Sequence, residues 1–127
     1  MKVLNLFPLT VTQDKINVDE HERSLLINEI KNMQLNNNKQ SSYAWTGDTN
    51  GYEFLFENKL FGNLAKKISE SVIKYLQLLE INTDLLDIYY QRSWATYTKS
   101  QQSINFHTHS QSNISFAYYL LKPKNSG

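Results

Sequence analysis

Two histidines lie two residues apart in the C-terminal part of the sequence, at His107 and His109. Side chains at positions i and i+2 of a β-strand project from the same face, so a strand here would bring both imidazoles to one side. Zinc, copper and iron all accept imidazole ligands, and two neighbouring imidazoles can share one metal ion. The spacing therefore predicts a metal site at this pair, and the alternative interpretation is a pair of solvent-exposed histidines on a polar strand face.

The rest of the sequence gives little support to other chemistry. There is no cysteine, which excludes thiolate nucleophiles and cysteine-based zinc sites. The sequence has neither a Gly-x-Ser-x-Gly motif nor a glycine-rich phosphate loop,. No carboxylate or histidine follows His109, whereas iron(II) oxygenases use two histidines and a carboxylate. The remaining histidine, His21, lies among charged residues and is interpreted as a solvated surface residue.

Composition and charge indicate an ordinary globular domain. The 127 residues are 40% hydrophobic and 20% charged, with a formal net charge of +1, which is typical of one soluble domain. Basic residues are scattered, so nothing indicates nucleic acid or an anionic membrane as a partner. The N-terminal apolar stretch ends at Pro8, too soon for a signal peptide, and we expect no membrane-spanning segment because no apolar run is long enough,. Together with the lack of cysteine, this leads us to expect a cytoplasmic protein.

Two amphipathic helices are predicted. The first covers residues 19–35, where Asp19 and Glu22 have the spacing of a capping box,, and its inner face carries Leu26, Ile30 and Met33. The second covers residues 60–79 after Asn58, a suitable N-cap. Its apolar residues recur every three or four positions, as on one helix face: Phe61, Leu64, Ile68, Val72, Tyr75 and Leu79.

From residue 86 onwards the apolar pattern changes to a period of two. This period predicts strands at 86–97, 104–109 and 114–121, with a polar turn at 99–102, and a further short strand is expected at 3–7. Helices followed by consecutive strands with short connections indicate an α+β fold with an antiparallel meander. The segment 43–52 combines turn formers with three aromatic residues. We interpret it as a loop that closes the core, and the alternative is a loop lining a substrate entrance.

Several segments occur together in a recognisable order: Leu6-Phe7-Pro8, Ala44-Trp45-Thr46-Gly47-Asp48, Gln91-Arg92-Ser93-Trp94, His107-Thr108-His109 and Ile114-Ser115-Phe116-Ala117-Tyr118-Tyr119-Leu120. This set spans nearly the whole chain and resembles the 2-oxoglutarate- and iron(II)-dependent oxygenases of phages and bacteria, relatives of the prolyl-hydroxylase-like group. The resemblance implies a double-stranded β-helix, or jelly roll, with N-terminal helices packed on antiparallel strands. Residues 1–127 would then be a single domain, the N-terminal part of an oxygenase-like jelly roll.

The resemblance also implies residue roles and cofactors. His107 and His109 would bind iron(II), and Tyr97 and Tyr119 would hydrogen-bond the carboxylate of 2-oxoglutarate. The chain departs from the family at His109, where a carboxylate is usual, and it lacks the later histidine and the basic residue that pairs with 2-oxoglutarate. We therefore interpret the domain as C-terminally truncated and expect it to bind little iron and to show no turnover by itself.

Two expectations follow from an incomplete jelly roll. A second copy of the chain, forming a homodimer, or a missing C-terminal segment would complete the sheet, because open strand edges pair readily. The expected function is hydroxylation of an unidentified substrate. The alternative is a non-catalytic binding or assembly module built on the same fold.

Overall fold

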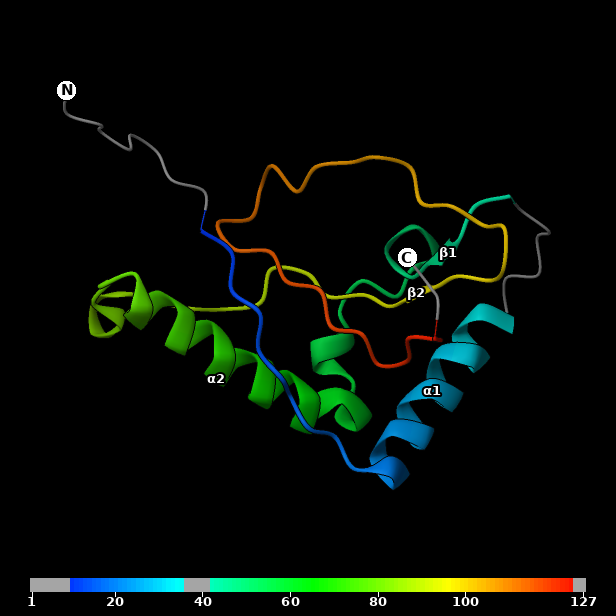
Figure 1. Ribbon diagram of the computed structural model, residues 1–127, viewed down its shortest axis with the longest axis horizontal. Coiled ribbons are helices and arrows are strands. Elements are labelled where there is room, and N and C mark those ends of the chain that lie inside the picture. The colour runs from blue at the N-terminus through cyan, green and yellow to red at the C-terminus, as the bar shows by residue number, and fades with distance from the viewer. Residues whose placement is uncertain (1–9, 36–41, 125–127) are drawn as a thin grey trace.

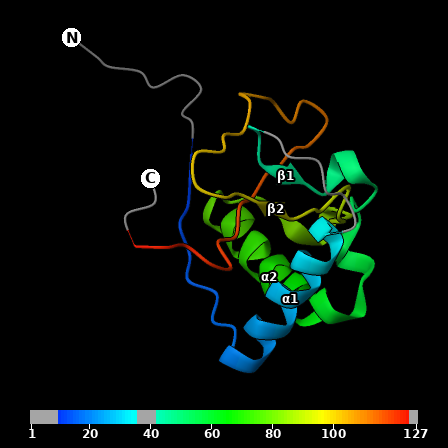
Figure 2. The same ribbon diagram turned by 90° about the vertical axis from the view of Figure 1, so that its right-hand side faces the viewer.

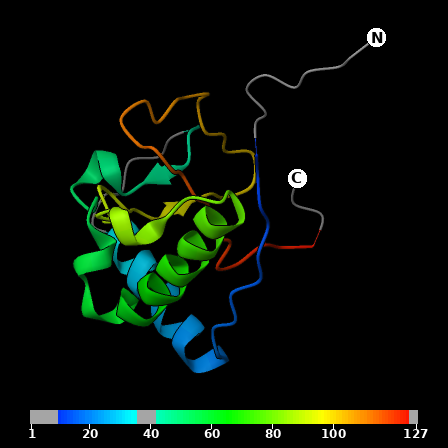
Figure 3. The same ribbon diagram turned by 90° about the vertical axis from the view of Figure 1, so that its left-hand side faces the viewer.

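Two helices lie on one side of a short antiparallel ribbon in the computed structural model of the chain (Figure 1). The structure describes residues 10–35 and 42–124, and the strand expected at 3–7 lies outside these ranges. The helices are α1 (Glu20–Leu35) and α2 (Gly62–Leu78), and the ribbon pairs β1 (Trp45–Thr46) with β2 (Thr96–Tyr97). Figures 2 and 3 show the same arrangement from the two ends, with the ribbon above both helices.

The first predicted helix is confirmed to within one residue. Asp19 caps it, because its Oδ1 accepts a hydrogen bond from the Glu22 backbone N–H at 2.8 Å,. The Glu22 carboxylate accepts two hydrogen bonds from Asn63 Nδ2, at 2.8 and 3.0 Å, and so joins α1 to the start of α2. Leu26 and Met33 are buried on the inner face, and His21 is exposed as expected.

The second predicted helix is confirmed as α2, preceded by a 3-10 turn at Lys59–Phe61. Asn58 caps this turn, since its Oδ1 accepts from the Leu60 backbone N–H at 3.0 Å. The buried part of the predicted stripe consists of Phe61, Leu64 and Ile68, while Val72 and Tyr75 are half-buried. Leu79 lies just beyond the helix and is partly exposed. Burial of a large apolar side chain contributes roughly 1.5–3 kcal/mol, so this face of α2 is a main source of stability.

The core lies between the two helices and the chain that leads into α2. Its buried members are Val18, Leu26, Met33, Leu55, Phe61, Leu64 and Ile68. Trp45 and Tyr52 pack against this cluster with ring centroids 6.1 Å apart, so the aromatic loop closes the core. Gly47 allows the loop to approach β2 closely: its N–H donates to Ala95 O at 2.9 Å, and an added Cβ would lie 2.9 Å from Tyr52 O.

Most of the expected strand structure is not formed in the described part of the chain. Of residues 86–97 only Thr96–Tyr97 is a strand, and residues 104–109 and 114–121 are irregular. The polar turn is present, because the Gln102 backbone N–H donates to Lys99 O at 3.2 Å. A strand is stable only where a neighbouring strand pairs with its backbone groups. Within the described ranges, the ribbon pairs two residues of β1 with two residues of β2. The fold class is therefore α+β with a small ribbon.

The irregular chain after β2 first arches away from the helices and then returns beside them (Figures 1 and 2). Phe106 is fully exposed, and the other large apolar side chains that are exposed in this segment are Ile104, Phe116, Tyr119 and Leu121. Exposed apolar side chains are a common feature of surfaces that bind another protein when they form one patch. Among the described residues, no helix combines the length and the apolar character needed to cross a membrane.

Candidate metal-binding site

The structure brings the two imidazoles together on the irregular segment after the turn. The ring centroids of His107 and His109 are 4.8 Å apart, and the ring planes are nearly perpendicular at 88°. Both side chains are exposed. The i, i+2 spacing thus places both rings on one side of the chain, although residues 104–109 do not form a strand.

The spacing of the two rings fits two ligands on one metal ion. A metal at about 2.1 Å from a ring nitrogen would lie about 3.2 Å from that ring centre, so two imidazoles bound at a right angle would have centres roughly 4.5 Å apart. The observed separation of 4.8 Å is close to this value. The separation of the ring centres is therefore compatible with two ligands on one metal ion, and it is also the separation of an ordinary edge-to-face contact between two rings,.

A hydrogen bond fixes which nitrogen of His107 is available. His107 Nδ1 lies 2.8 Å from the backbone carbonyl oxygen of Asn105. A carbonyl oxygen only accepts, so Nδ1 carries the proton and Nε2 presents its lone pair to solvent. Metal-binding histidines in proteins usually donate their second N–H in this way.

The described residues do not complete a metal-binding set. In this part of the chain no three side chains among His, Asp and Glu come close enough to hold a metal ion. Residues 1–9, 36–41 and 125–127, which the structure does not describe, contain none of these residue types.

A group of three residues behind His109 was missed by sequence reasoning as part of the site. The indole of Trp94 lies 5.3 Å from the His109 ring, centroid to centroid. The guanidinium of Arg92 lies 5.4 Å from the Trp94 ring and is paired with Glu53, Nη2 to Oε2, at 2.6 Å. Arg92 and Trp94 are two residues apart, the same spacing as the histidines, which is the signal that could have grouped them. Nothing in the sequence singles out Glu53, which is remote along the chain.

The two tyrosines expected to bind 2-oxoglutarate lie on different segments. Tyr97 is half-buried in β2, where it pairs with Trp45 across the ribbon. Tyr119 is exposed on the irregular chain, and the Lys122 ammonium lies 5.6 Å from its ring centroid. Within residues 10–35 and 42–124, the ring contacts of the imidazoles are to each other and to Trp94. In this part of the chain, neither tyrosine makes a ring contact with the histidine pair.

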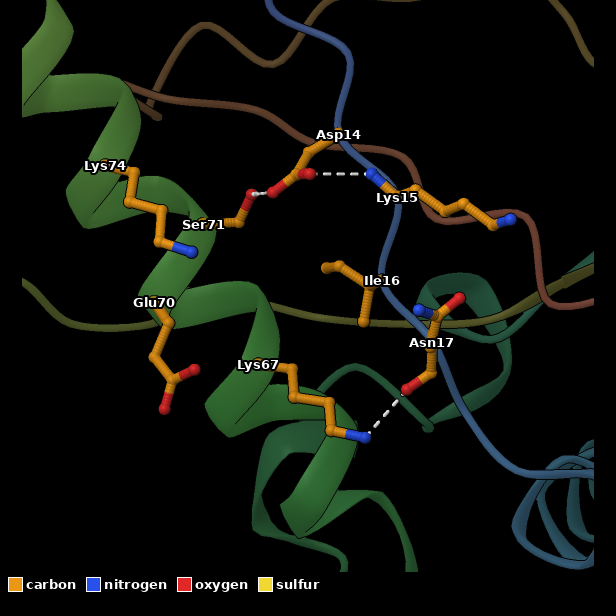
Figure 4. Close-up of a pocket in the computed structure, with 8 residues that line it drawn as sticks. All are labelled: Asp14, Lys15, Ile16, Asn17, Lys67, Glu70, Ser71 and Lys74. Carbon is orange, nitrogen blue, oxygen red and sulfur yellow. Dashed lines mark hydrogen bonds between the residues drawn. The ribbon is translucent and has the colours of Figure 1, made fainter.

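A hollow of about 380 Å³ lies elsewhere, between residues 14–17 and α2 (Figure 4). Lys67, Ser71 and Tyr75 are four residues apart and share one face of the helix. Lys67 Nζ donates to Asn17 O at 2.7 Å, Ser71 Oγ to Asp14 Oδ2 at 2.6 Å and Tyr75 Oη to Thr10 O at 2.9 Å. The residues before α1 are thus tied along α2 in the antiparallel direction at each helical turn.

These bonds also affect the ionisation of Asp14. The hydrogen bond from Ser71 is the larger cause that lowers the pKa of this carboxyl, and the Lys15 backbone N–H is the next. Both favour the charged form, because they donate to the carboxylate. Since Asp14, Ser71 and Lys67 form hydrogen bonds across the hollow, we interpret it as the seam between the N-terminal segment and α2.

Comparisons with family models, with curated proteins and with solved structures found no match to this chain.

Proposed function

We propose that this chain is part of an iron(II)- and 2-oxoglutarate-dependent oxygenase in which His107 and His109 supply two of the metal ligands. The observation that supports this most directly is the pair of perpendicular imidazoles 4.8 Å apart, with His107 Nδ1 directed to the Asn105 carbonyl. Bound iron(II) would supply the oxidising chemistry, in which O₂ and 2-oxoglutarate are consumed to hydroxylate a C–H bond and to release succinate and CO₂. The role of the two histidines is to hold the metal and to leave its other positions open.

The proposal extends to the fold and the cosubstrate. Residues 104–109 and 114–121 keep the alternating pattern of strands, and pairing with further strands would convert these irregular segments into part of a jelly roll. Tyr97 and Tyr119 would then be carried on paired strands, from which their hydroxyl groups would hydrogen-bond the carboxylate of 2-oxoglutarate. This proposal requires a rearrangement of the chain around Tyr119, because that side chain is now exposed.

The activity predicted for this chain depends on what completes the site. With iron(II), 2-oxoglutarate and air, we expect the 127 residues alone to release succinate at the rate of a protein-free blank. A longer protein from the same reading frame that adds a histidine and a basic residue should release succinate above that blank. His107→Ala in the longer protein should abolish this release, since one metal ligand is lost. Succinate release that His107→Ala leaves unchanged would contradict the proposal.

A non-catalytic assembly module is the second candidate, and the exposed apolar side chains after β2 favour it. Phe106 and Leu121 are in water in the described structure, and exposed apolar side chains that gather in a patch commonly mark an interface between proteins. A second copy of the chain is the simplest partner, because identical subunits form closed two-fold dimers more often than other assemblies. The same dimer would also pair the irregular segments of both subunits.

Association should therefore depend on this apolar segment. In sedimentation velocity runs at micromolar concentrations we expect a dimer, and Phe106→Ser should shift the equilibrium to monomer, because a fully exposed ring is removed,. Leu85→Ser is the matched control, since Leu85 is also highly exposed but precedes the segment. A parent protein that stays monomeric, or equal effects of both substitutions, would count against this interface.

A further inference from the structure

A continuous series of contacts connects Glu53 to the histidine pair. Glu53 Oε2 accepts from Arg92 Nη2 at 2.6 Å, and the Arg92 guanidinium lies 5.4 Å from the centre of the Trp94 ring. Trp94 in turn contacts His109, at 5.3 Å between ring centres and an interplanar angle of 46°. Planar guanidinium groups stack well on indole rings, so the pairing of Arg92 with Glu53 also restrains the orientation of Trp94.

The backbone that carries Trp94 is fixed to the core. Ser93 N–H donates to Glu53 O and Leu55 N–H donates to Ser93 O, both at 2.9 Å. The Ser93 hydroxyl also accepts from the Phe56 backbone N–H at 2.9 Å. Leu55 is a buried member of the core. Trp94 therefore projects from a well-anchored position.

The segment that carries the histidines is held by few bonds. The Ser112 backbone N–H donates to His109 O at 3.1 Å, and the Ser112 hydroxyl lies 3.2 Å from Gln91 Oε1. Both imidazoles are exposed; the His107 ring is held by its hydrogen bond to the Asn105 carbonyl, whereas the His109 ring would be free to change rotamer without a ring contact. Trp94 belongs to the anchored part of the chain, and among the described residues its ring contact with His109 links that part to the histidine pair.

We propose that Trp94 is a positioning residue that holds the His109 imidazole next to His107, and that Arg92, paired with Glu53, holds Trp94. The value of this contact for metal binding rests on the proposed function, but the contact itself does not. An imidazole restrained in its binding orientation loses less freedom when it coordinates a metal. Residues that orient a ligand from behind typically affect metal affinity by 10- to 100-fold, and we expect roughly tenfold for this exposed pair.

The test compares Trp94→Leu, which removes the aromatic ring, with Trp94→Phe, which keeps one. The first measurement is the nuclear magnetic resonance spectrum of the histidine rings without metal. The chain has three histidines, so single alanine substitutions assign their signals. The ring current of Trp94 should displace the His109 ring protons in the parent. The displacement should persist in part in Trp94→Phe and disappear in Trp94→Leu.

The second measurement is the Ni²⁺ affinity of the same proteins. We expect roughly tenfold weaker binding in Trp94→Leu than in the parent and a smaller loss in Trp94→Phe. Arg92→Lys keeps the charge but loses the planar group, and it should shift the His109 signals and weaken Ni²⁺ binding in the same direction. Arg23→Lys is the matched control, because Arg23 pairs with Glu20 on α1 at 3.0 Å, and it should change neither measurement.

The outcomes separate the positioning role from the metal site. His109 signals that do not move in Trp94→Leu, or equal Ni²⁺ affinities of the Leu and Phe variants, would overturn the positioning role. A parent that binds no Ni²⁺ although its His109 signals move in Trp94→Leu would overturn the proposed function and support the contact. If Trp94→Leu does not fold, as judged by thermal unfolding, Arg92→Lys decides the question with the same two measurements.

Discussion

Replacing His107 with alanine is expected to remove most of the affinity of this chain for divalent transition metals. The parent should bind Ni²⁺ and Cu²⁺ weakly and iron(II) more weakly still, because iron(II) ranks below both for nitrogen ligands. His107→Ala leaves His109 as a single imidazole. Removing an outer-shell partner of a metal site typically weakens metal binding by roughly 10- to 100-fold. Removing a ligand itself should cost no less, so we expect the Ni²⁺ affinity to fall at least about tenfold. Isothermal titration calorimetry under anaerobic conditions gives the metal dissociation constants of the parent and of His107→Ala.

The chain provides a matched control for this experiment. His21 is exposed on α1, outside the candidate site, so His21→Ala should leave the Ni²⁺ affinity unchanged. Metal binding by the parent should also weaken as the solution is acidified, because an imidazole must lose its proton to coordinate. Equal weak binding by the parent and His107→Ala would remove His107 from the site. Tight stoichiometric binding of iron(II) by the parent would show that the site is complete.

The helices could be predicted from sequence because their signals are local. The cap joins Asp19 to Glu22, three positions later,. Successive residues of the stripe on α2 are three or four positions apart,. The predicted end of α2 differs from the observed one by one residue. Leu79 fits the periodicity, yet it lies past the last helical residue, where periodicity alone does not identify a boundary,.

The strands could not be predicted in the same way, because a strand depends on a distant partner. Residues 104–109 have a clear period of two, but the period says nothing about whether a neighbouring strand is present. Within residues 10–35 and 42–124, the strand pairing consists of Trp45 with Tyr97 and Thr46 with Thr96, together with two isolated bridges, Tyr43 to Ser103 and Phe54 to Ser93. These short strands come from segments about fifty positions apart, and no pattern within either segment indicates the other.

The candidate site shows the same division between local and distant information. The approach of His107 and His109 follows from their spacing in the sequence. Trp94 reaches His109 through the fold, and Glu53 reaches Arg92 across 39 positions. The ion pair is partly exposed and would be worth little by itself. Its proposed importance comes from its place behind the ring that touches His109.

Leu26→Ala is expected to cause the largest loss of stability among single substitutions in this chain. Leu26 is the large side chain with no exposed surface, at 0%, and it belongs to the core cluster between α1 and α2. Truncating a buried leucine typically costs about 2–5 kcal/mol, through lost apolar transfer and the cavity that remains. Domains of this size have a total free energy of unfolding of roughly 5–15 kcal/mol, so the variant should unfold at a clearly lower urea concentration.

The neighbouring leucine provides the control. Leu25 lies on the same helix but is 43% exposed, so Leu25→Ala makes the same change in helix propensity and removes less buried volume. We expect it to cost about 1 kcal/mol. Urea unfolding followed by the fluorescence of Trp45 and Trp94 gives both free energies. Equal losses for the two variants would mean that the face of α1 assigned to the core is wrong. If Leu26→Ala lowers the free energy of unfolding several times more than Leu25→Ala does, α1 packs on the core through Leu26. The positions of α2 and the ribbon depend on this packing.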